Sequence, residues 1–348
     1  MADLDSVKRF LKNYDGPEMN IMEICGSHTA AIAKNGIPSL LSPKIHLISG
    51  PGCPVCVTPS SYIDRLISLA GMKGHCVVTF GDLIRVPGSG ESLASARGKG
   101  ARVAMVYSPM DIIPMAEKEP ATIFVFAAVG FETTTPVYAL LMQELTEKKI
   151  TNVRLLTALK TMPPVVEKLC GDGAPVNGFL APGHVCTVSG YAAYEPLAEK
   201  YGIPFGVAGF SGQGLLIAIT GIVKNCGKGV VKNYYPMVVS REGNREAQTL
   251  TDRYFEPAPA VWRGLGMIEG SGRVLREPYR EYDAGSFDLT EDRQANPACR
   301  CSEVLTGRVR PRECPLFGKV CTPMTPQGAC MVSQEGSCFT YLTAGRRD

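Results

Sequence analysis

Short apolar runs recur along the chain as far as residue 214, and most of them have a glycine or a proline at or near their end. They occupy residues 44–53, 75–83, 102–109, 122–132, 153–160, 176–185 and 203–214. Runs of this kind, rich in β-branched residues and bounded by turn formers, are typical of buried strands. The segments between them have helical character, as in 58–71, where Thr58 or Ser60 can cap the helix, and in 136–149. Apolar strands that alternate with helices predict a parallel sheet covered on both faces.

The number of strand and helix pairs predicts an α/β protein with two doubly wound parallel sheets in series. We expect the first α/β domain to span 1–145 and the second to span 146–225. Beyond that point the pattern changes, with one predicted helix near 240–255 and then a loop-rich segment dense in cysteine. This change predicts a third, smaller domain over 226–348, and the N-terminal segment can pack on it.

Composition and charge narrow the class of protein. The chain has 348 residues, of which 45% are hydrophobic, and this is enough to build several cores without external cross-links. The formal charge is +3 and the basic residues are scattered, so we expect no nucleic-acid partner. The opening MADLDSVKRFLKNYDG lacks the apolar core of a signal peptide, and no apolar run is long enough to span a bilayer. We therefore expect a cytoplasmic protein that does not enter a membrane.

The thirteen cysteines change this picture, because a cytoplasmic protein seldom uses cysteine for disulfides. Six of them crowd into the C-terminal segment, at Cys299, Cys301, Cys314, Cys321, Cys330 and Cys338. No histidine lies among them, which favours ligation by thiolates alone, in an iron–sulfur cluster or a zinc site. The segment lacks the paired CxxC knuckles of zinc ribbons, so the cluster is the leading interpretation, with zinc or unligated thiols as alternatives.

The spacing within this segment suggests which cysteines act as ligands. Six, eight and seven residues separate Cys314, Cys321, Cys330 and Cys338, so one continuous loop stiffened by prolines can wrap a cluster. Cys299 and Cys301 would then lie close by, and either of them is an alternate ligand. We expect Cys76, Cys170, Cys186 and Cys226, which lie elsewhere in the chain, to be ordinary buried thiols.

A second group of cysteines lies near the N-terminus. Cys53 and Cys56 form a CxxC pair in GPGCPVCVTP, directly after a predicted strand. Such a pair can be a redox dithiol, half of a metal site or a simple turn. Cys25 and His28 lie three residues apart in MEICGSHT, a spacing that by itself is more often accidental than functional.

Two further loops at strand ends carry polar side chains. Glu132 begins ETTT after one strand, and His184 lies in APGHVC after another. Ligands of open parallel sheets sit beyond the carboxyl ends of strands, so these loops can converge on one site. Alternatively, Glu132 caps a helix and His184 is a hydrogen-bonded turn residue. His46, inside an apolar run, is expected to be a core or edge residue.

Taken together, these motifs resemble the HypD family of nickel–iron hydrogenase maturation factors. The resemblance rests on CGSHT, GPGCPVCVTP, GFETTTP, PGHV, GFSGQ and the cysteine-rich tail, in this order between about residues 20 and 341. It implies two α/β domains and a third domain that holds a 4Fe-4S cluster. It also implies a scaffold that assembles the Fe(CN)2CO moiety of the hydrogenase together with a HypC-type small chaperone, with a HypE-type protein as the cyanide donor.

The resemblance also implies roles for individual residues. Cys25, Cys53 and Cys56 match iron-associated cysteines, His28 accompanies them, and Glu132 and His184 lie in the other signature loops. Low-spin iron that carries cyanide and carbon monoxide favours soft thiolate donors, and we expect the histidines to donate hydrogen bonds to the cyanide nitrogens. Electrons from the cluster are expected to reduce the CxxC pair before iron is loaded.

Two hypotheses from other classes stay open. One is an iron–sulfur-dependent thiol-disulfide oxidoreductase unrelated to hydrogenase maturation. The other is a structural adaptor whose cysteine-rich knot stabilises it while its surface binds partners. Iron in excess of the cluster's own, with infrared bands of cyanide and carbon monoxide, would distinguish the scaffold from both.

Overall fold

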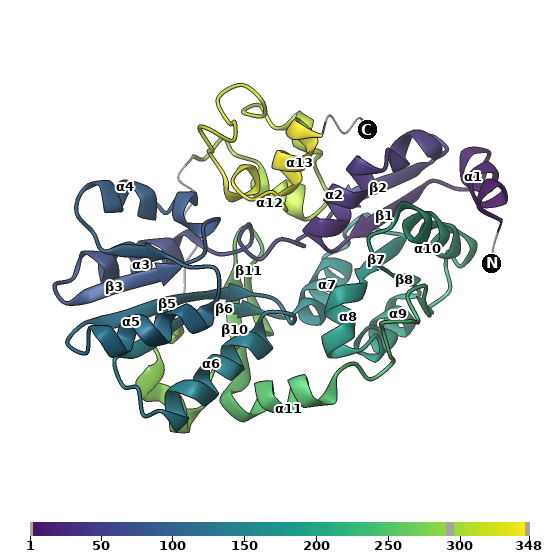
Figure 1. The fold of residues 1–348 in the computed structure, drawn as a ribbon. Coiled ribbons are helices and arrows are strands. Elements are labelled where there is room, and N and C mark those ends of the chain that lie inside the picture. The colour runs from purple at the N-terminus through teal and green to yellow at the C-terminus, as the bar shows by residue number, and fades with distance from the viewer. Residues whose placement is uncertain (1–2, 290–295, 345–348) are drawn as a thin grey trace.

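The computed structural model of the chain describes residues 3–289 and 296–344, and within them two sheets are formed (Figure 1). The five-stranded sheet has the order β2-β1-β7-β8-β9, and all its neighbouring strands are parallel. Its strands are β1 (Met19–Glu23), β2 (Ile45–Ser49), β7 (Gly178–Pro182), β8 (Phe205–Ala208) and β9 (Val231–Asn233).

The six-stranded sheet has the order β10-β11-β6-β5-β3-β4. It is parallel from β6 to β4, whereas β10 and β11 form an antiparallel hairpin added to the edge of β6. Its strands are β3 (His75–Thr79), β4 (Val103–Met105), β5 (Ile123–Gly130), β6 (Val153–Lys160), β10 (Phe255–Trp262) and β11 (Gly266–Leu275). The expected α/β class with two parallel sheets is therefore confirmed.

Helices cover both faces of each sheet. The five-stranded sheet has α1 (Leu4–Lys12), α2 (Gly26–Lys34) and α10 (Gly212–Lys224) on one face, and α7 (Met162–Gly171) and α9 (Glu195–Tyr201) on the other. The six-stranded sheet lies between α3 (Ser60–Gly71) with α4 (Leu93–Gly98) and α5 (Ile112–Lys118) with α6 (Thr135–Glu147). The remaining helices are α8 (Gly183–Ser189), α11 (Arg245–Tyr254), α12 (Cys301–Leu305) and α13 (Ser337–Thr343).

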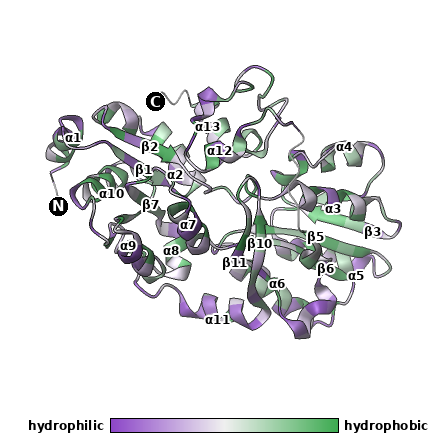
Figure 2. Cartoon of the chain, turned by 180° about the vertical axis from the view of Figure 1, so that it is seen from behind, coloured by the Kyte–Doolittle hydropathy of each residue, from purple (hydrophilic) through white to green (hydrophobic). Residues whose placement is uncertain are grey.

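Strand β5 shows why these runs are apolar almost throughout. Phe124 and Phe126 pack with α5 and α6, whereas Val125 and Ala127 pack with α3. Successive side chains of a strand point to opposite faces, so a strand covered on both sides needs apolar residues at every position. Figure 2 shows the result: the middle of β3 is hydrophobic, and α11 at the outside of the molecule is largely hydrophilic.

The order of strands along the chain differs from their order in space. β1 and β2 join β7, β8 and β9 in one sheet, although β3 to β6 lie between them in the sequence. The domain limit expected at 145 falls between β5 and β6, which are neighbouring strands of one sheet. The limit expected at 225 falls between β8 and β9, which are neighbouring strands of the five-stranded sheet. A hydrophobic run specifies a buried strand but not its neighbours, so sequential limits and sheets need not coincide.

The C-terminal segment lies across the junction of the two sheets. In Figure 1 it is the yellow region between α2 and the hairpin β10–β11. The expected third domain, 226–348, is divided in the structure: β10 and β11 extend the six-stranded sheet, and the cysteine-rich part after 296 is separate. Residues 290–295 and 345–348 of that domain lie outside the described residues. None of the described helices has both the length and the apolar character needed to cross a bilayer.

Candidate metal and thiol site

Cys25 lies at the carboxyl end of β1, where it is the N-cap residue of α2. Its side chain is buried, and burial raises the pKa of the thiol to about 12. The backbone N–H groups of His28 and Ser27 point at the sulfur and oppose this rise. Without a metal the group is therefore a neutral thiol at pH 7, and a bound cation is what would favour the thiolate.

The CxxC loop lies directly against Cys25. β1 and β2 are adjacent parallel strands, so their carboxyl ends bring the two loops to the same edge of the sheet. The N–H of Gly26 donates to the carbonyl oxygen of Gly52 at 3.0 Å. A Cβ atom at Gly52 would overlap the backbone of Cys25, so only glycine permits this approach.

Cys53 and Cys56 are joined as a disulfide in the structure, and both are buried. Their Cα atoms are 5.2 Å apart. The Sγ atom of Cys53 also accepts the backbone N–H of Cys56 at 3.2 Å. The pair can therefore close within a turn that is already formed, as a redox-active CxxC requires.

His28 lies in the first turn of α2 and is fully buried. Its Nε2 atom is 3.1 Å from the carbonyl oxygen of Ala208 and 3.2 Å from that of Gly209. Carbonyls only accept, so the proton of neutral His28 is on Nε2, and Nδ1 is an acceptor without a partner in the described residues. Burial lowers the pKa of His28 to about 4, which keeps it neutral. The expected donor role of His28 toward cyanide does not fit this state, because its only N–H is already bonded to the protein.

His184 begins α8 beside His28, and one aromatic ring covers both. The ring centroid of Phe210 is 5.2 Å from each of the two imidazoles. Burial lowers the pKa of His184, and its Nδ1 atom has no partner in the part of the chain that is described. The motif GFSGQ thus supplies Gly209 as an acceptor and Phe210 as the cover of the histidines.

The two carboxylate oxygens of Glu132 have different surroundings. Its Oε1 atom accepts the backbone N–H of Met162 at 2.7 Å, and so caps α7. Its Oε2 atom is buried without a partner in the described residues, and burial raises the pKa of the carboxyl group to about 6. The group also lines a cavity of about 230 Å³ together with Thr251 and Arg273. The alternative that Glu132 is a helix cap is therefore correct for one of its oxygens, although the capped helix is not the next one along the chain.

Tyr194 is a residue that the sequence pattern did not single out. Its side chain is 1% exposed, and its hydroxyl has no hydrogen-bond partner in the described residues. Burial raises the pKa of this phenol, and the nearby Cys186, Glu132 and Cys25 raise it further. A buried hydroxyl without a partner is rare, but nothing in the local sequence marks it, since an aromatic residue before a helix is unremarkable.

The six tail cysteines lie close to one another in the structure. Five of them line a small cavity: Cys299, Cys301, Cys314, Cys321 and Cys338. A Cβ atom at Gly328 would be 2.8 Å from the sulfur of Cys299 and 3.0 Å from that of Cys301, so glycine gives these thiols their room. Cys330 is fully buried and is not part of this lining. It follows Ala329, whose carbonyl oxygen is 3.8 Å from the Sγ atom of Cys56.

The donor set suits an iron–sulfur cluster. In such a cluster each thiolate binds a different iron, so the sulfurs stand around a cavity rather than around one point. A zinc site would gather four donors around one ion, whereas five of the tail cysteines are spread around a small cavity. Neither in the tail nor around Cys25 and the CxxC loop do the described residues present three or more His, Cys, Asp or Glu side chains already placed to hold a metal ion.

The other cysteines follow the expectation only in part. Cys76 and Cys186 are buried, as expected. Cys170 is only half-buried and Cys226 is exposed, so the expectation of a buried thiol is wrong for these two. Cys226 follows the end of α10 rather than lying within it, and a residue beyond a helix end escapes the amphipathic pattern on which such an expectation rests.

Comparison with known proteins gives a consistent result. The pattern of the family described as "HypD: Hydrogenase formation hypA family" matches residues 4–345. Hydrogenase maturation factor HypD1 of Bradyrhizobium diazoefficiens is 41% identical over 338 residues, which cover 93% of this chain and 89% of that protein. Hydrogenase expression/formation protein HupD of Azotobacter chroococcum is 40% identical over 342 residues, which cover 95% of this chain and 90% of that protein.

Proposed function

Because this chain belongs to the HypD family of hydrogenase maturation factors, we propose that it is the scaffold on which the Fe(CN)2CO moiety is assembled. The partners in this proposal are a HypC-type small chaperone and a HypE-type cyanide donor. The observation that carries it is the contact of the two cysteine loops, in which Gly26 N–H donates to Gly52 at 3.0 Å. Once the Cys53–Cys56 disulfide is reduced, Cys25, Cys53 and Cys56 offer three thiols at one edge of a sheet, where parallel folds bind ligands.

The iron of this moiety is the cargo of the protein, and the thiols are suited to hold it. Soft thiolates suit an iron that carries cyanide and carbon monoxide. A free thiolate at Cys25 is disfavoured by burial, so the positive charge of iron is needed to displace its proton. The backbone N–H groups of Ser27 and His28 then stabilise the sulfur charge, and the ring of Phe210 shields the neighbouring histidines from water.

The resident cofactor in this proposal is a 4Fe-4S cluster in the tail. Cys314, Cys321 and Cys338 line the cavity, and either Cys299 or Cys301 would complete a set of four. This choice differs from the set expected from spacing, because Cys330 is fully buried and does not line the cavity, although its side chain interacts with that of Cys301. When bound, a cluster of this type supplies electrons one at a time.

The position of Ala329, next to Cys330 in the chain, supports a redox link between the tail and the CxxC pair. Reduction of the Cys53–Cys56 disulfide takes two electrons and two protons and yields two thiols. The Sγ atom of Cys56 lies against Ala329, so the tail reaches the disulfide directly. In the reduced state the Cys56 thiol can donate to the Ala329 carbonyl, which would hold it in place until iron arrives.

Replacement of Cys25 tests the iron role. We expect Cys25→Ser to abolish maturation of a hydrogenase and to remove the infrared bands of cyanide and carbon monoxide from the purified protein. The absorption band of the tail cluster should persist, because the substitution lies outside the tail. Cys226→Ser, at an exposed cysteine, is the matched control and should keep both properties. An active hydrogenase matured by Cys25→Ser would show that Cys25 is not an essential iron ligand.

A second candidate is a thiol-disulfide oxidoreductase that does not assemble iron. The observation that favours it is the disulfide Cys53–Cys56 beside the cysteine-rich tail. The two functions differ in iron content, since an oxidoreductase needs only the iron of its cluster. Iron in excess of the cluster, lost in Cys25→Ser but not in Cys226→Ser, would favour the scaffold.

A further inference from the structure

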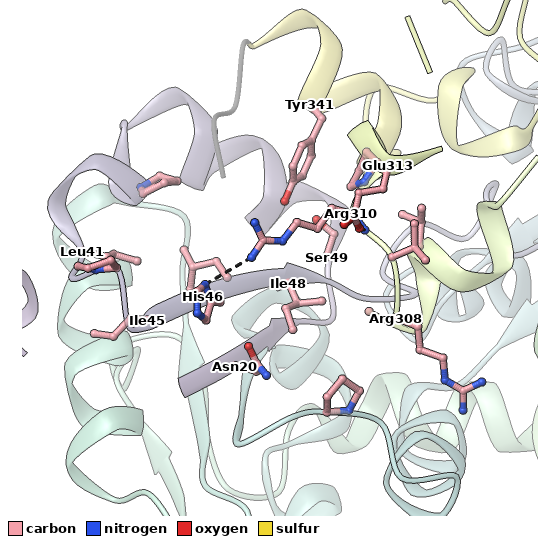
Figure 3. A pocket seen from close by; sticks show the side chains of 18 of the residues that line it. Asn20, Leu41, Ile45, His46, Ile48, Ser49, Arg308, Arg310, Glu313 and Tyr341 are labelled. Atoms are coloured by element: carbon pink, nitrogen blue, oxygen red, sulfur yellow. Dashed lines mark hydrogen bonds between the residues drawn. The ribbon is translucent and has the colours of Figure 1, made fainter. Parts of the chain in front are cut away.

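A cavity of about 470 Å³ lies between strand β2 and the tail segment 307–311 (Figure 3), and its basic side chains have partners within the protein. The Nη2 atom of Arg310 is 3.5 Å from Nδ1 of His46, the dashed line in the figure. Nη2 of Arg308 donates to the carbonyl oxygen of Asp172 at 3.4 Å. A second, smaller cavity differs from it, because two of the residues that line it have a buried oxygen without a partner in the described residues.

The smaller cavity has a volume of about 230 Å³ and lies at the ends of two neighbouring strands. Glu132 follows β5 and Thr161 follows β6, and these two strands are parallel. Helix α11 contributes Thr251 and Asp252 to the lining, and strand β11 contributes Arg273. Open parallel sheets bind their ligands beyond the carboxyl ends of adjacent strands, so the cavity lies where a ligand is expected. We call it the Glu132 cavity.

The two oxygens without a partner are Oε2 of Glu132 and Oγ1 of Thr251. The other carboxylate oxygen of Glu132 accepts the backbone N–H of Met162 at 2.7 Å, and this bond fixes the position of the group. Buried polar atoms in proteins are nearly always hydrogen-bonded, and one that is left without a partner lowers stability. A ligand that donates hydrogen bonds to Glu132 and Thr251 would complete both groups.

The Glu132 cavity also contains a positive charge that does not pair with Glu132. Within the described residues the ion pair of Arg273 is with Asp252, between Nη1 and Oδ1 at 3.3 Å. The side chain of Asp252 is 63% exposed, so water weakens this single contact. Arg273 lowers the pKa of the Glu132 carboxyl group, although burial outweighs this effect and raises it. Two opposite charges therefore act on each other within one cavity without forming an ion pair.

A ligand that satisfies these groups needs a positive end and a negative end. The pKa of Glu132 is about 6, so at pH 7 the group is mostly ionised and an ammonium group would neutralise it while donating hydrogen bonds. A carboxylate would accept from the guanidinium of Arg273, which has five N–H donors. An amine alone would leave Arg273 without this bond, and a carboxylate alone would be repelled by Glu132. The volume is below that of sites for drug-sized ligands, so the ligand must be small.

From this geometry we propose that the Glu132 cavity binds a small α-amino acid as its zwitterion, with Glu132 and Thr251 at the ammonium group and Arg273 at the carboxylate. The cysteines of the two loops, Cys25, Cys53 and Cys56, are not among the described residues that line this cavity, so binding does not require iron. A bound amino acid would connect α11 and β11 to the ends of β5 and β6.

Calorimetric titration of the purified full-length protein tests this proposal. The probes are glycine, L-alanine and L-serine, and each is compared with the amine that lacks its carboxylate and the acid that lacks its ammonium group. For L-alanine these are ethylamine and propionate. We expect the amino acids to bind and the singly charged analogues to bind at least tenfold more weakly, because one charged group of the cavity then stays without its partner. This comparison uses the native protein, so it does not depend on the folding of any variant.

Substitutions in the cavity should weaken binding of the amino acids. We expect Glu132→Gln and Arg273→Gln each to weaken it about tenfold or more, and Thr251→Val, which keeps the shape of the side chain, to weaken it several-fold. Glu246→Gln and Arg253→Gln make the same charge changes at exposed positions of α11 and should leave binding unchanged.

Three results would overturn the proposal. The first is that none of the three amino acids binds at concentrations up to about 100 mM. The second is that an amino acid binds no more tightly than its amine or its acid, since the site would then recognise a single charge. The third is that binding is unchanged in Glu132→Gln or is weakened equally by the two substitutions at exposed positions.

Discussion

The Sγ atom of Cys56 lies 3.8 Å from the carbonyl oxygen of Ala329, although 273 residues separate them in the sequence. This contact joins the CxxC loop after β2 to the cysteine-rich tail. It places the backbone at Ala329 beside the Cys53–Cys56 disulfide, whereas five tail cysteines line a cavity and the side chain of the sixth, Cys330, interacts with that of Cys301. The tail therefore meets the thiol pair through its backbone, next to the cysteines suited to a cluster.

Cys330 is expected to be dispensable for the cluster. We expect Cys330→Ala to keep its iron and sulfide, whereas Cys314→Ala, Cys321→Ala and Cys338→Ala should lose them, because these three line the cavity. Iron and sulfide analysis of the purified variants decides the matter. Loss of the cluster in Cys330→Ala would restore the set expected from spacing, and full occupancy in every tail variant would rule out a cluster in this segment.

The Cys53–Cys56 pair should change its oxidation state as a unit. In the structure the two sulfurs are bonded to each other within a buried turn. Because the two thiols are held this close together, oxidation of either one is expected to form the disulfide with the other. We expect mass mapping with an alkylating reagent to label both cysteines under reducing conditions and neither under oxidising conditions. Exposed Cys226 should be labelled as a free thiol in both states. A pair that stays reduced at every redox potential would remove the redox step from the proposed function.

Glu132 should make the protein less stable as the pH rises from 4.5 to 6. Burial raises the pKa of its carboxyl group to about 6, from 4.5, so in this window the folded state binds more protons than the unfolded state. The folded state must then ionise a buried group above pH 6, at a cost of about 2 kcal/mol. Glu132→Gln, which can still accept the N–H of Met162 and does not titrate, should lose this pH dependence.

Urea unfolding of Glu132→Gln at pH 4.5 and pH 7.5 measures this effect. The exposed Glu246→Gln, on α11, is the control and should leave the pH profile of the native protein unchanged. If Glu132→Gln and the native protein lost the same free energy of unfolding between the two pH values, the carboxyl group would not be buried as described.

His28 should make the protein less stable as the pH falls. Its pKa is lowered to about 4 by burial, from 6.5, so between these values the unfolded chain binds a proton that the folded chain does not. Stability should therefore fall as the pH falls from 6.5 to 4, by about 3 kcal/mol for this group. A glutamine at this position can donate to the carbonyls of Ala208 and Gly209 without titrating, so His28→Gln should be less sensitive to acid.

The free energy of unfolding at pH 7 and pH 4.5 measures this difference. His184, whose pKa burial also lowers, should leave a residual acid sensitivity in His28→Gln. His75→Gln, at the partly exposed start of β3, is the control and should retain the full sensitivity of the native protein. An unchanged acid sensitivity in His28→Gln would show that His28 is protonated in the folded protein.

The sequence by itself determined the local features of this protein. Apolar runs, most of them ended by glycine or proline, specified buried parallel strands, since burial on both faces requires apolar residues throughout. The positions of Cys53 and Glu132 at the ends of such runs placed them at strand ends, whereas strand β1, which precedes Cys25, was not among the predicted runs. The density of cysteine after residue 298 marked a thiol-rich region, and the ordered motifs indicated the family.

Only the tertiary structure decided which of these features meet. The hydrophobic pattern of β1 and β2 does not record that their sheet is completed by β7, β8 and β9, because any buried strand presents the same backbone to its neighbours. The contact of Cys56 with Ala329 depends on where the tail crosses the sheets, and the proton position on His28 depends on the carbonyls of β8 and its loop. The cavity between strand β2 and residues 307–311 exists because these two segments, distant in the sequence, lie next to each other in the fold. Such relationships are set by packing between parts of the chain that no local pattern connects.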